Sequence, residues 1–356
     1  MTHRFIKACL ALAIAGITGA SAQLAVAAPN ATEAAVLRMN AIKGDARHQI
    51  LVDEAKKEGG QLSLYHVNIE DIPAMAEAFT KKYGIKVKVW RSSSENVTRR
   101  IATESQAGRF DADIVDSNGP GLEALHREKL LQPVVSPYDA DLIPQAFRPH
   151  REWVATTLDA FVAGYNPTKV KKEDLPKTYQ DLLDPKWKGM LAVESEDQTW
   201  FAMILEKMGP EKGRKLFQDI VATNGIQVRK GHSLLANMVV SGEVPLALTL
   251  YQYKPEQLKK KGAAIDWFTL APVIVQTRGI AMLKNAPRPY TAMLFYDFML
   301  NEGQQIYASR LHHPMSKKFD GAKGTTNMVF LDPARAIDEN EKWTQDYEKT
   351  ITKAMK

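Results

Sequence analysis

Residues 62–90 read LSLYHVNIEDIPAMAEAFTKKYGIKVKVW, and this stretch decides the fold class. Its first six residues, LSLYHV, are apolar and β-favouring, which indicates a buried strand. Residues 72–84, IPAMAEAFTKKYG, carry apolar side chains at helical spacing and end on a glycine, which is typical of a helix and its terminus. Residues 85–90, IKVKVW, alternate as a strand does. Strand, helix and strand in succession predict an α/β layer architecture with a mainly parallel sheet.

The same alternation continues toward the C-terminus and then repeats in a second block. A helix is predicted through VTRRIATESQAG, a strand at ADIVDS and a helix at PGLEALHREKLL. Two β-favouring stretches, residues 153–166 and 264–283, are long enough to cross from one block to the other. Two α/β blocks joined by two crossing segments form a cleft, and a cleft is where a small ligand is normally held.

The N-terminus has the pattern of an export signal. Arg4 and Lys7 precede the apolar run CLALAIAGITGA, and small-residue sites follow at 20–22 and 25–27. The run is shorter than the roughly 20 residues that a spanning helix needs. We therefore expect a cleavable signal peptide over residues 1–27 and a soluble, periplasmic mature chain.

Composition excludes several classes of function. The 356 residues, 45% hydrophobic and 25% charged, are enough for two packed domains. The only cysteine, Cys9, lies in the predicted signal, so the mature chain can form neither disulfides nor thiolate metal ligands. Losing the two basic residues of the signal lowers the formal charge from +6 to +4. That charge favours neither a nucleic-acid partner nor a membrane surface.

Several segments together resemble a known family. GIKVKVW, ADIVDS, DLLDPKWKGMLAV, VSGEVPLALTLYQY and RGIAMLKNAPRPYTAMLFYDFMLNEGQQIYA occur in the order found in periplasmic solute-binding proteins of ABC importers. The branch is the one with ferric-iron-, phosphonate- and sugar-phosphate-binding members, and the resemblance runs from about Leu62 to Met315. It implies the type II two-lobed periplasmic binding protein fold, with a mixed sheet flanked by helices in each lobe and two crossing strands as the hinge.

The resemblance also implies a division of the chain and a way of working. The expected parts are the signal peptide 1–27, an N-terminal helical segment 28–60, a first lobe of 61–158 and 262–310, and a second lobe of 159–261 and 311–356. A monomer would capture a small solute in the cleft and deliver it to an ABC permease in the inner membrane. No covalent chemistry is needed, and G-x-S-x-G or H-E-x-x-H motifs do not occur, so we expect no enzyme.

The stretch LTLYQYKPE, residues 248–256, falls where ferric-binding relatives carry two adjacent tyrosines. A phenol becomes a good ligand when a strongly charged cation displaces its proton. In this chain Gln252 and Tyr253 occupy the two positions, and Tyr251 would have to substitute from the neighbouring one. If the solute is iron, the resemblance implies Tyr253, Tyr251 and Tyr165 as its ligands.

Positions in the first lobe depart further from the iron-binding pattern. His66 and Glu70 lie near the family's first-strand ligand position with a shifted register. Ser117, followed by Asn118, stands where the family has a carboxylate. Asp159 stands where many iron-binding members hold a companion anion with an arginine. We keep His66, Ser117, Asn118 and Asp159 as candidate ligand-binding residues.

Other polar groups leave the nature of the solute open. Ser93 precedes a helix, where backbone N–H groups could bind an anion or the serine could simply cap the helix. Glu194 and Glu196 would suit an amine or another cation, or would form a solvated acidic loop. Arg91 and Arg278 could instead grip a carboxylate or phosphonate.

Two classes of solute therefore remain open. The role also has one alternative to transport. Ferric iron, as a transported ligand and not a resident cofactor, is the default that the resemblance implies. The rival is a small organic ion such as a phosphonate, polyamine or carboxylate, and a solute sensor uncoupled from transport would show the same sequence. We interpret His312 and His313 as structural, since two adjacent histidines rarely share one ion.

Overall fold

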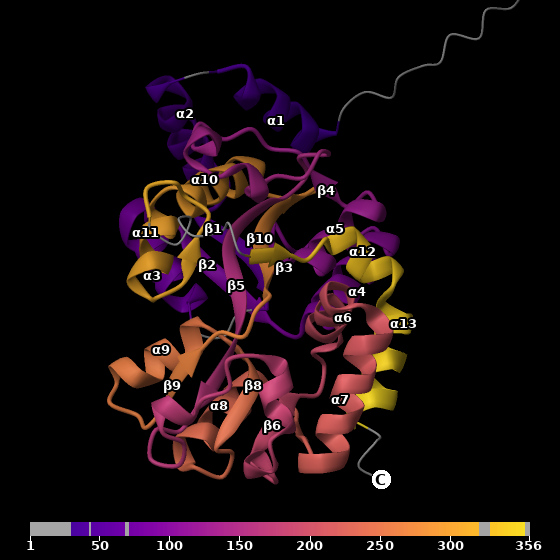
Figure 1. Ribbon diagram of the computed structural model, residues 1–356. Helices are drawn as coiled ribbons and strands as arrows, with labels where there is room; N and C mark the ends of the chain where they lie inside the picture. The colour runs from indigo at the N-terminus through magenta and orange to yellow at the C-terminus, as the bar shows by residue number, and fades with distance from the viewer. Residues whose placement is uncertain (1–29, 43, 68–70, 320–327, 353–356) are drawn as a thin grey trace, which may run out of the picture.

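The computed structural model describes residues 30–42, 44–67, 71–319 and 328–352. The predicted signal peptide lies outside these residues. Within them, no helix is both long and apolar enough to cross a bilayer. The chain forms two α/β lobes, one above the other in Figure 1, with β5 running from one to the other. The predicted mixed α/β fold is confirmed.

The strands form one continuous hydrogen-bonded path in the order β2-β1-β3-β10-β5-β8-β6-β7. Their bounds are β1 Gln61–His66, β2 Lys86–Arg91, β3 Ile114–Asn118, β4 Leu131–Gln132, β5 Val154–Tyr165, β6 Leu191–Glu194, β7 Gln227–Arg229, β8 Leu246–Tyr251, β9 Asp266–Phe268, β10 Val273–Leu283, β11 His313–Pro314 and β12 Met328–Phe330. Strands β2, β1 and β3 are parallel, as are β8, β6 and β7, while β10 and β5 run antiparallel to their neighbours on this path.

The helices cover both faces of this path (Figure 1). Their bounds are α1 Ala31–Asn40, α2 Asp45–Lys57, α3 Ile72–Tyr83, α4 Ser94–Gln106, α5 Gly119–Arg127, α6 Gln198–Met208, α7 Pro210–Asn224, α8 His232–Ser241, α9 Tyr253–Lys260, α10 Pro289–Leu300, α11 Glu302–Ser309, α12 Pro333–Asp338 and α13 Asn340–Tyr347. The predicted β1-α3-β2 unit is present, and Gly84 ends α3 in the left-handed conformation, with φ of 71°, that glycine adopts without strain.

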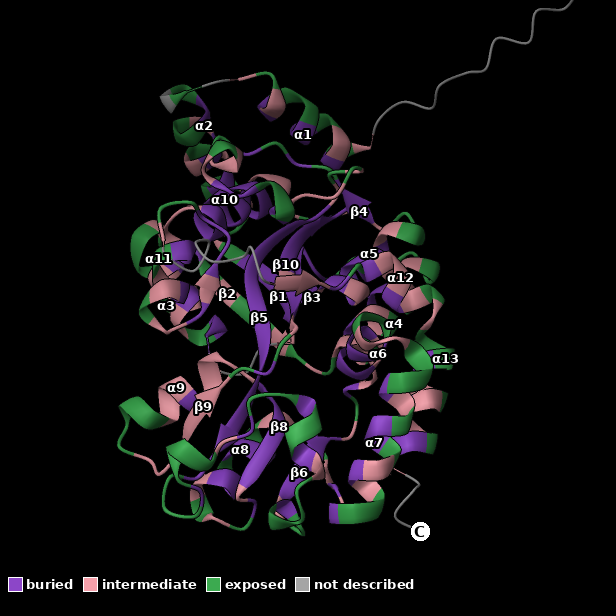
Figure 2. Cartoon of the chain, viewed as in Figure 1, coloured by how far each residue is buried: buried purple, intermediate pink, exposed green. Residues whose placement is uncertain are grey.

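The two predicted crossing segments are β5 and β10. In β5, residues up to Ala160 pair with β10, whereas Phe161 to Tyr165 pair with β8 of the second lobe. Every residue of β5 is buried, which is why this stretch reads as a continuous β-favouring run and not as an alternating one (Figure 2). Strands β5 and β10 therefore connect the lobes and also lie at the bottom of the space between them, which we call the floor.

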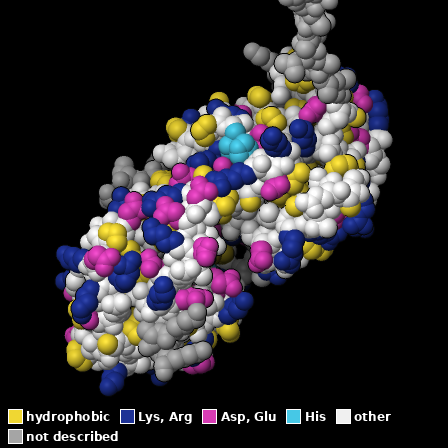
Figure 3. Space-filling view, turned by 90° about the vertical axis from the view of Figure 1, so that its right-hand side faces the viewer, with side chains coloured by type: hydrophobic (Ala, Val, Ile, Leu, Met, Phe, Trp, Pro, Cys, Tyr) yellow, Lys and Arg dark blue, Asp and Glu magenta, His cyan; other side chains and the backbone are white. Residues whose placement is uncertain are grey.

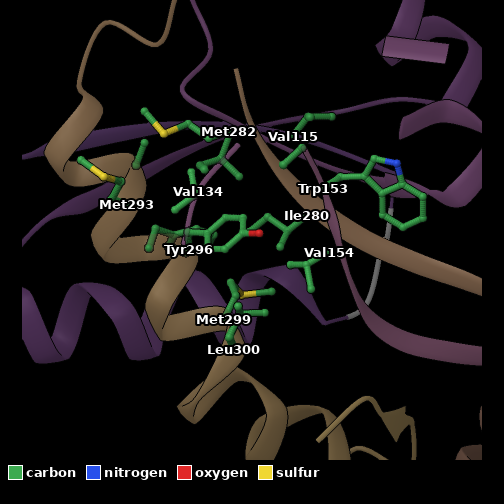
Figure 4. Close-up of a cluster of buried hydrophobic side chains, with 14 of the residues drawn as sticks. Val115, Val134, Trp153, Val154, Ile280, Met282, Met293, Tyr296, Met299 and Leu300 are labelled. Carbon is green, nitrogen blue, oxygen red and sulfur yellow. The ribbon is translucent and has the colours of Figure 1, made fainter. Parts of the chain in front are cut away.

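Each lobe has its own hydrophobic core. The core of the first lobe includes Val115, Trp153, Ile280, Met293 and Leu300, drawn with their neighbours in Figure 4. Aromatic side chains such as Phe201 and Phe217 fill one cluster of the second lobe, and a smaller cluster lies under α8. Two separate cores joined by two strands allow the lobes to move as rigid bodies.

Core membership refines the expected lobe boundaries. The N-terminal helices belong to the first lobe, because Val36 and Leu51 pack in its core. Ile265 and Leu270 pack in the second lobe although we expected residues 262–310 in the first. Met315 packs in the first lobe although we expected residues 311–356 in the second. We therefore propose that the chain returns to the first lobe within β10 and leaves it again after β11.

The C-terminal segment contacts both lobes. Asp338 at the end of α12 forms an ion pair with Arg127 on α5, at 2.6 Å. Arg335 on the same helix forms an ion pair with Glu206 on α6 of the second lobe, also at 2.6 Å. The short strand β12 pairs with β10 immediately before α12. This segment is thus a third connection across the cleft.

Candidate functional site

The candidate site lies between the lobes, where several elements of the second lobe begin or end. Strands β6 and β8 end there, and helices α6, α8 and α9 begin there. The ends of β1 and β3 contribute the first-lobe side, and β5 and β10 form the floor. Ligands of α/β sheets normally bind at the carboxyl ends of the strands, so this is the expected place for a solute.

A row of four aromatic rings crosses the site, and we call it the aromatic row: His232, Tyr251, Tyr253 and His312. The imidazole of His232 stacks on Tyr251 with ring centroids 4.2 Å apart. The rings of Tyr251 and Tyr253 are nearly parallel, at 12°, with centroids 6.3 Å apart. Tyr253 in turn lies 4.1 Å from His312, which follows α11 of the first lobe. The row therefore connects the two lobes.

Turn geometry places the two tyrosines side by side. Tyr251 is the last residue of β8 and Tyr253 the first of α9, with Gln252 at the junction. A strand would project residues i and i+2 to the same face, and the immediate turn into a helix keeps both rings at the cleft. Gln276 on β10 donates a hydrogen bond from Nε2 to the Tyr251 hydroxyl oxygen at 2.7 Å. This contact fixes the hydroxyl against the floor.

The pKa of the Tyr251 phenol is raised well above its ordinary value. Burial is the main cause, and the carboxylates of Asp197 and Asp159 add to it. The neutral phenol is therefore the stable form without a bound cation. A solute that coordinates this oxygen as phenolate must carry enough positive charge to displace the proton.

The floor of the site holds a buried ion pair with unused polar atoms. Arg278 on β10 contacts Asp159 on β5 at 3.2 Å, and both side chains are largely buried. Within the described residues, Nε of Arg278 and Oδ1 of Asp159 have no hydrogen-bond partner. Buried polar atoms are normally satisfied, so these two indicate a place where a bound solute or water completes the contacts.

A second buried carboxyl lies next to this pair. Asp116 on β3 is fully buried, and burial raises its pKa to about 7, opposed by the charge of Arg278. The nearby carboxylates of Asp71 and Asp159 raise that pKa further. Asp71 itself lies 2.8 Å from Nε2 of His312 at the first-lobe end of the aromatic row. Negative groups thus surround the row from the first lobe.

The second lobe contributes a carboxylate and imidazole cluster of Glu194, Asp197 and His232. Nε2 of His232 lies 3.1 Å from Asp197, and the two carboxylates raise the pKa of His232 against the effect of burial. Backbone N–H groups of Gly231 and Glu196 donate to the Glu194 carboxylate, which keeps it in place. Such a cluster can pair with a cation.

The structure brings together some of the residues that the sequence singled out. Tyr251, Tyr253, Glu194 and Asp159 surround the same space, as the aromatic row and the ion pair show. His66 ends β1 opposite Asp116 in register, buried at the first-lobe side.

Four of the predicted ligand-binding residues make local structural contacts or lie on the protein surface. The Asn118 side chain caps α5 by accepting from the Gly121 N–H, and Ser117 is tied to Ser94 at 3.0 Å. Ser93 is exposed and caps α4, so the capping alternative describes its contacts. Glu196 is exposed and forms an ion pair with Lys230 on the surface.

Tyr165 is the clear correction. It is buried in the core of the second lobe at the far end of β5, with its ring against Phe268. Tyr251 pairs with Phe161, four residues earlier on β5, so Tyr165 stands about 13 Å further along the strand. It cannot share an ion with Tyr251 and Tyr253 in this conformation.

Sequence reasoning did not single out His232 or Gln276, and it assigned His312 a structural role. His232 is the first residue of the helix-forming run HSLLANMVV. The only feature of the sequence that could have indicated a site there is a polar residue at a helix start after a short strand. His312, which we interpreted as structural, touches Tyr253. The adjacent His313 pairs with Leu158 in β11, so the two histidines do not act together.

Comparisons with known proteins agree with this architecture. Residues 67–306 match the family described as bacterial extracellular solute-binding protein. The Fe(3+)-binding periplasmic protein of Serratia marcescens is 28% identical over 193 residues, which cover 53% of this chain and 55% of that protein. The match thus spans about half the length of that relative. Iron uptake protein A1 of Synechocystis sp. is 26% identical over 310 residues, covering 78% of this chain and 85% of that protein.

A solved structure gives the same result for the fold. The iron-bound HitA structure from Pseudomonas aeruginosa superposes with a TM-score of 0.69 at 25% identity. The superposition covers 80% of this chain and 98% of that one. The superposition therefore takes in nearly all of that chain's fold.

Proposed function

Because the chain belongs to the bacterial extracellular solute-binding protein family, we propose that it captures ferric iron in the interlobe cleft and delivers it to the permease of an ABC importer. It would act in the periplasm as a monomer, after removal of the predicted signal peptide. The iron would be cargo and not a resident cofactor. The relatives named above, which carry iron in their names, support this choice of solute.

The observation that carries the proposal is the negative charge gathered around two phenols. Five buried carboxyl groups lie on elements that meet at the aromatic row, with one buried arginine among them; the carboxyl groups are Asp71, Asp116, Asp159, Glu194 and Asp197. Asp71 is paired with Arg310, Asp159 with Arg278 and Asp197 with His232, but the buried carboxyl groups still outnumber these cations, which favours a positive solute. Phenolate and carboxylate oxygens are also hard ligands that suit a hard trivalent ion.

Closure of the lobes would supply the transport signal. Tyr253 belongs to the second lobe and His312 follows the last helix of the first, so a solute between them is contacted from both sides. Only the closed arrangement makes both sets of contacts, and a solute that binds it better shifts the population toward closure. A permease can then recognise the closed surface.

A small organic cation such as a polyamine is the second candidate. The observation that favours it is Gln252, which stands where ferric-binding relatives carry the first tyrosine of a pair and whose side-chain oxygen is buried without a hydrogen-bond partner. Aromatic rings beside carboxylates also attract an ammonium group through cation–π and charge pairing. An anionic solute such as a phosphonate fits the surplus of carboxylates less well.

The experiment that separates these candidates is native mass spectrometry of the untagged chain purified from the periplasm in which it is made. A mass increment of one iron atom, with or without a small anion, supports the proposal. An increment that matches an organic amine supports the second candidate. A chain that gains no mass after incubation with ferric citrate contradicts the iron proposal.

A further inference from the structure

A second group of ligating side chains lies outside the cleft, on the first lobe, and we call it the α5 cluster: Glu123, His126, His150 and Glu152. Glu123 and His126 are three residues apart on α5, so both project from one face of the helix. His150 and Glu152 come from the segment just before β5. None of the four belongs to the interlobe site or follows from the proposed function.

The side chains of the α5 cluster contact one another closely. The imidazoles of His126 and His150 stack with centroids 3.7 Å apart and planes 12° apart. Nε2 of His150 lies 3.2 Å from the Glu123 carboxylate, and Nδ1 of His126 lies 2.8 Å from the Glu152 carboxylate. One ligand atom each from Glu123, His126 and His150 fall within 4.8 Å of one another.

These separations suit the ligand sphere of a small divalent ion. Zinc binds imidazole nitrogen and carboxylate oxygen at about 2.0–2.1 Å in tetrahedral geometry, which sets ligand atoms about 3.3 Å apart. Two imidazoles with carboxylates select zinc and neighbouring transition metals over magnesium or calcium, which prefer oxygen alone. The closest contacts of the α5 cluster are already near that spacing.

Neighbouring groups orient the ligands. The indole Nε1 of Trp153 lies 3.3 Å from the Glu123 carboxylate, to which it donates. The backbone N–H of Glu152 donates to Nδ1 of His150 at 3.1 Å and fixes the plane of that ring. The Trp153 contact is an outer hydrogen bond of the kind that holds ligands in place around protein-bound metals, whereas the Glu152 contact belongs to the metal-free state.

The site is open on one side. The Glu123 side chain is only 7% exposed, whereas His126 and Glu152 are 28% and 23% exposed. The face of the molecule shown in Figure 3, the right-hand side of Figure 1 where α5 and α12 lie, displays histidine side chains among charged ones at the surface. An ion could enter from solution without opening the lobes.

From these contacts we infer that the α5 cluster binds one divalent transition-metal ion of the zinc type, independently of the solute in the cleft. Because stacked, nearly parallel rings cannot both direct a nitrogen lone pair at one ion, the ring of His150 must rotate on binding. Its Nδ1 accepts the Glu152 amide, so Nε2 holds the proton that points at Glu123, and a neutral imidazole offers one acceptor nitrogen. An ion bound at Nε2 moves that proton to Nδ1 and so breaks the contact with the Glu152 amide, which keeps the affinity modest.

The test is isothermal titration of the untagged, full mature chain with zinc chloride at pH 7.5, with cobalt chloride as a spectroscopic probe. One ion should bind per chain, and cobalt should produce the visible absorption of a tetrahedral site. H126A and H150A should each weaken binding at least tenfold, whereas H48A, which removes an exposed histidine of α2, should leave it unchanged. H126Q serves as a second variant, and thermal melting checks that each variant is folded.

The outcome is independent of the cleft. Zinc binding should persist in Y251F and Y253F, whatever solute those tyrosines hold. Equal zinc affinity in the parent chain, H126A, H150A and H48A, or no zinc binding in the parent chain, would overturn the inference.

Discussion

The ring of His312 lies 4.1 Å from the ring of Tyr253, so a residue that follows the first lobe's last helix touches the candidate ligand of the second. His312 is held on its other side by Asp71, 2.8 Å from its Nε2. Because the contact joins the two lobes, we expect it to depend on their closure. It also gives the first of four predictions.

H312A should weaken solute binding about tenfold, because the first-lobe end of the aromatic row is lost while the second-lobe ligands remain. Intrinsic fluorescence titration with the solute identified by mass spectrometry measures the change. The matched control is H313A, which removes the neighbouring histidine that faces β5. A loss of affinity in H313A equal to that in H312A would contradict the role given to His312.

Q276L should weaken binding by a few fold. The Gln276 amide donates to the Tyr251 hydroxyl oxygen, and this hydrogen bond grows stronger when the oxygen becomes a phenolate. A single hydrogen bond to a charged oxygen contributes about 1.5–3 kcal/mol of stabilisation. In the variant, a water molecule can supply part of it by donating to the same oxygen. If iron is bound, the visible absorption band should also shift. An unchanged band and affinity would remove Gln276 from the site.

R278M should destabilise the solute-free protein by about 3–5 kcal/mol, since it leaves Asp159 charged and buried without its partner. D159N should cost less than R278M, because the Asp116 carboxyl group still lies near Arg278 and partly balances its charge. The double variant R278M/D159N should recover part of the loss. Urea unfolding of the three variants measures these differences, and simple additivity of the two single effects would contradict the coupling.

Asp116 predicts a pH dependence of stability. Its pKa is about 7 in the folded state against 3.8 for the exposed group, so the folded state binds more protons between these values. The contribution of this group to the free energy of unfolding therefore increases as the pH falls from 8 to 5. D116N should be more stable than the parent chain at pH 8 by a few kcal/mol, with the difference shrinking toward pH 5.

The control for this prediction is D53N, which changes an exposed aspartate of α2. Its unfolding free energy should follow the parent chain across the whole pH range. A D116N protein whose advantage stays constant from pH 8 to pH 5 would show that Asp116 does not titrate in that interval.

The fold was predictable because local patterns and topology agree along most of the chain. Residues 62–90 predicted the βαβ unit, and the uninterrupted β-favouring run of residues 153–166 predicted β5 as a crossing segment. Residues 290–310, YTAMLFYDFMLNEGQQIYASR, are helix-favouring throughout but form parts of two helices, since the backbone of Asn301 turns to φ −113° and ψ −91° between α10 and α11. Both halves are helix-favouring, so local propensity could not reveal this break.

The site was predictable only where its residues share a local motif. Tyr251 and Tyr253 lie in one short stretch, and their proximity follows from the strand end. Tyr165 was assigned to the site because it matched the family by sequence position, but its place on β5 depends on the register with β8. His232 and His312 come from distant segments with ordinary helical or loop composition, and only the three-dimensional fold brings them to the tyrosines.

The central claim is that Tyr251 and Tyr253, and not Tyr165, hold a ferric ion. The most direct measurement is the visible absorption spectrum of the purified chain during titration with ferric citrate, repeated for Y251F, Y253F and Y165F. We predict a phenolate-to-iron band in the parent chain that is retained in Y165F, is reduced in Y251F and is lost in Y253F. No band in the parent chain, or a band lost in Y165F and retained in Y253F, would contradict the account.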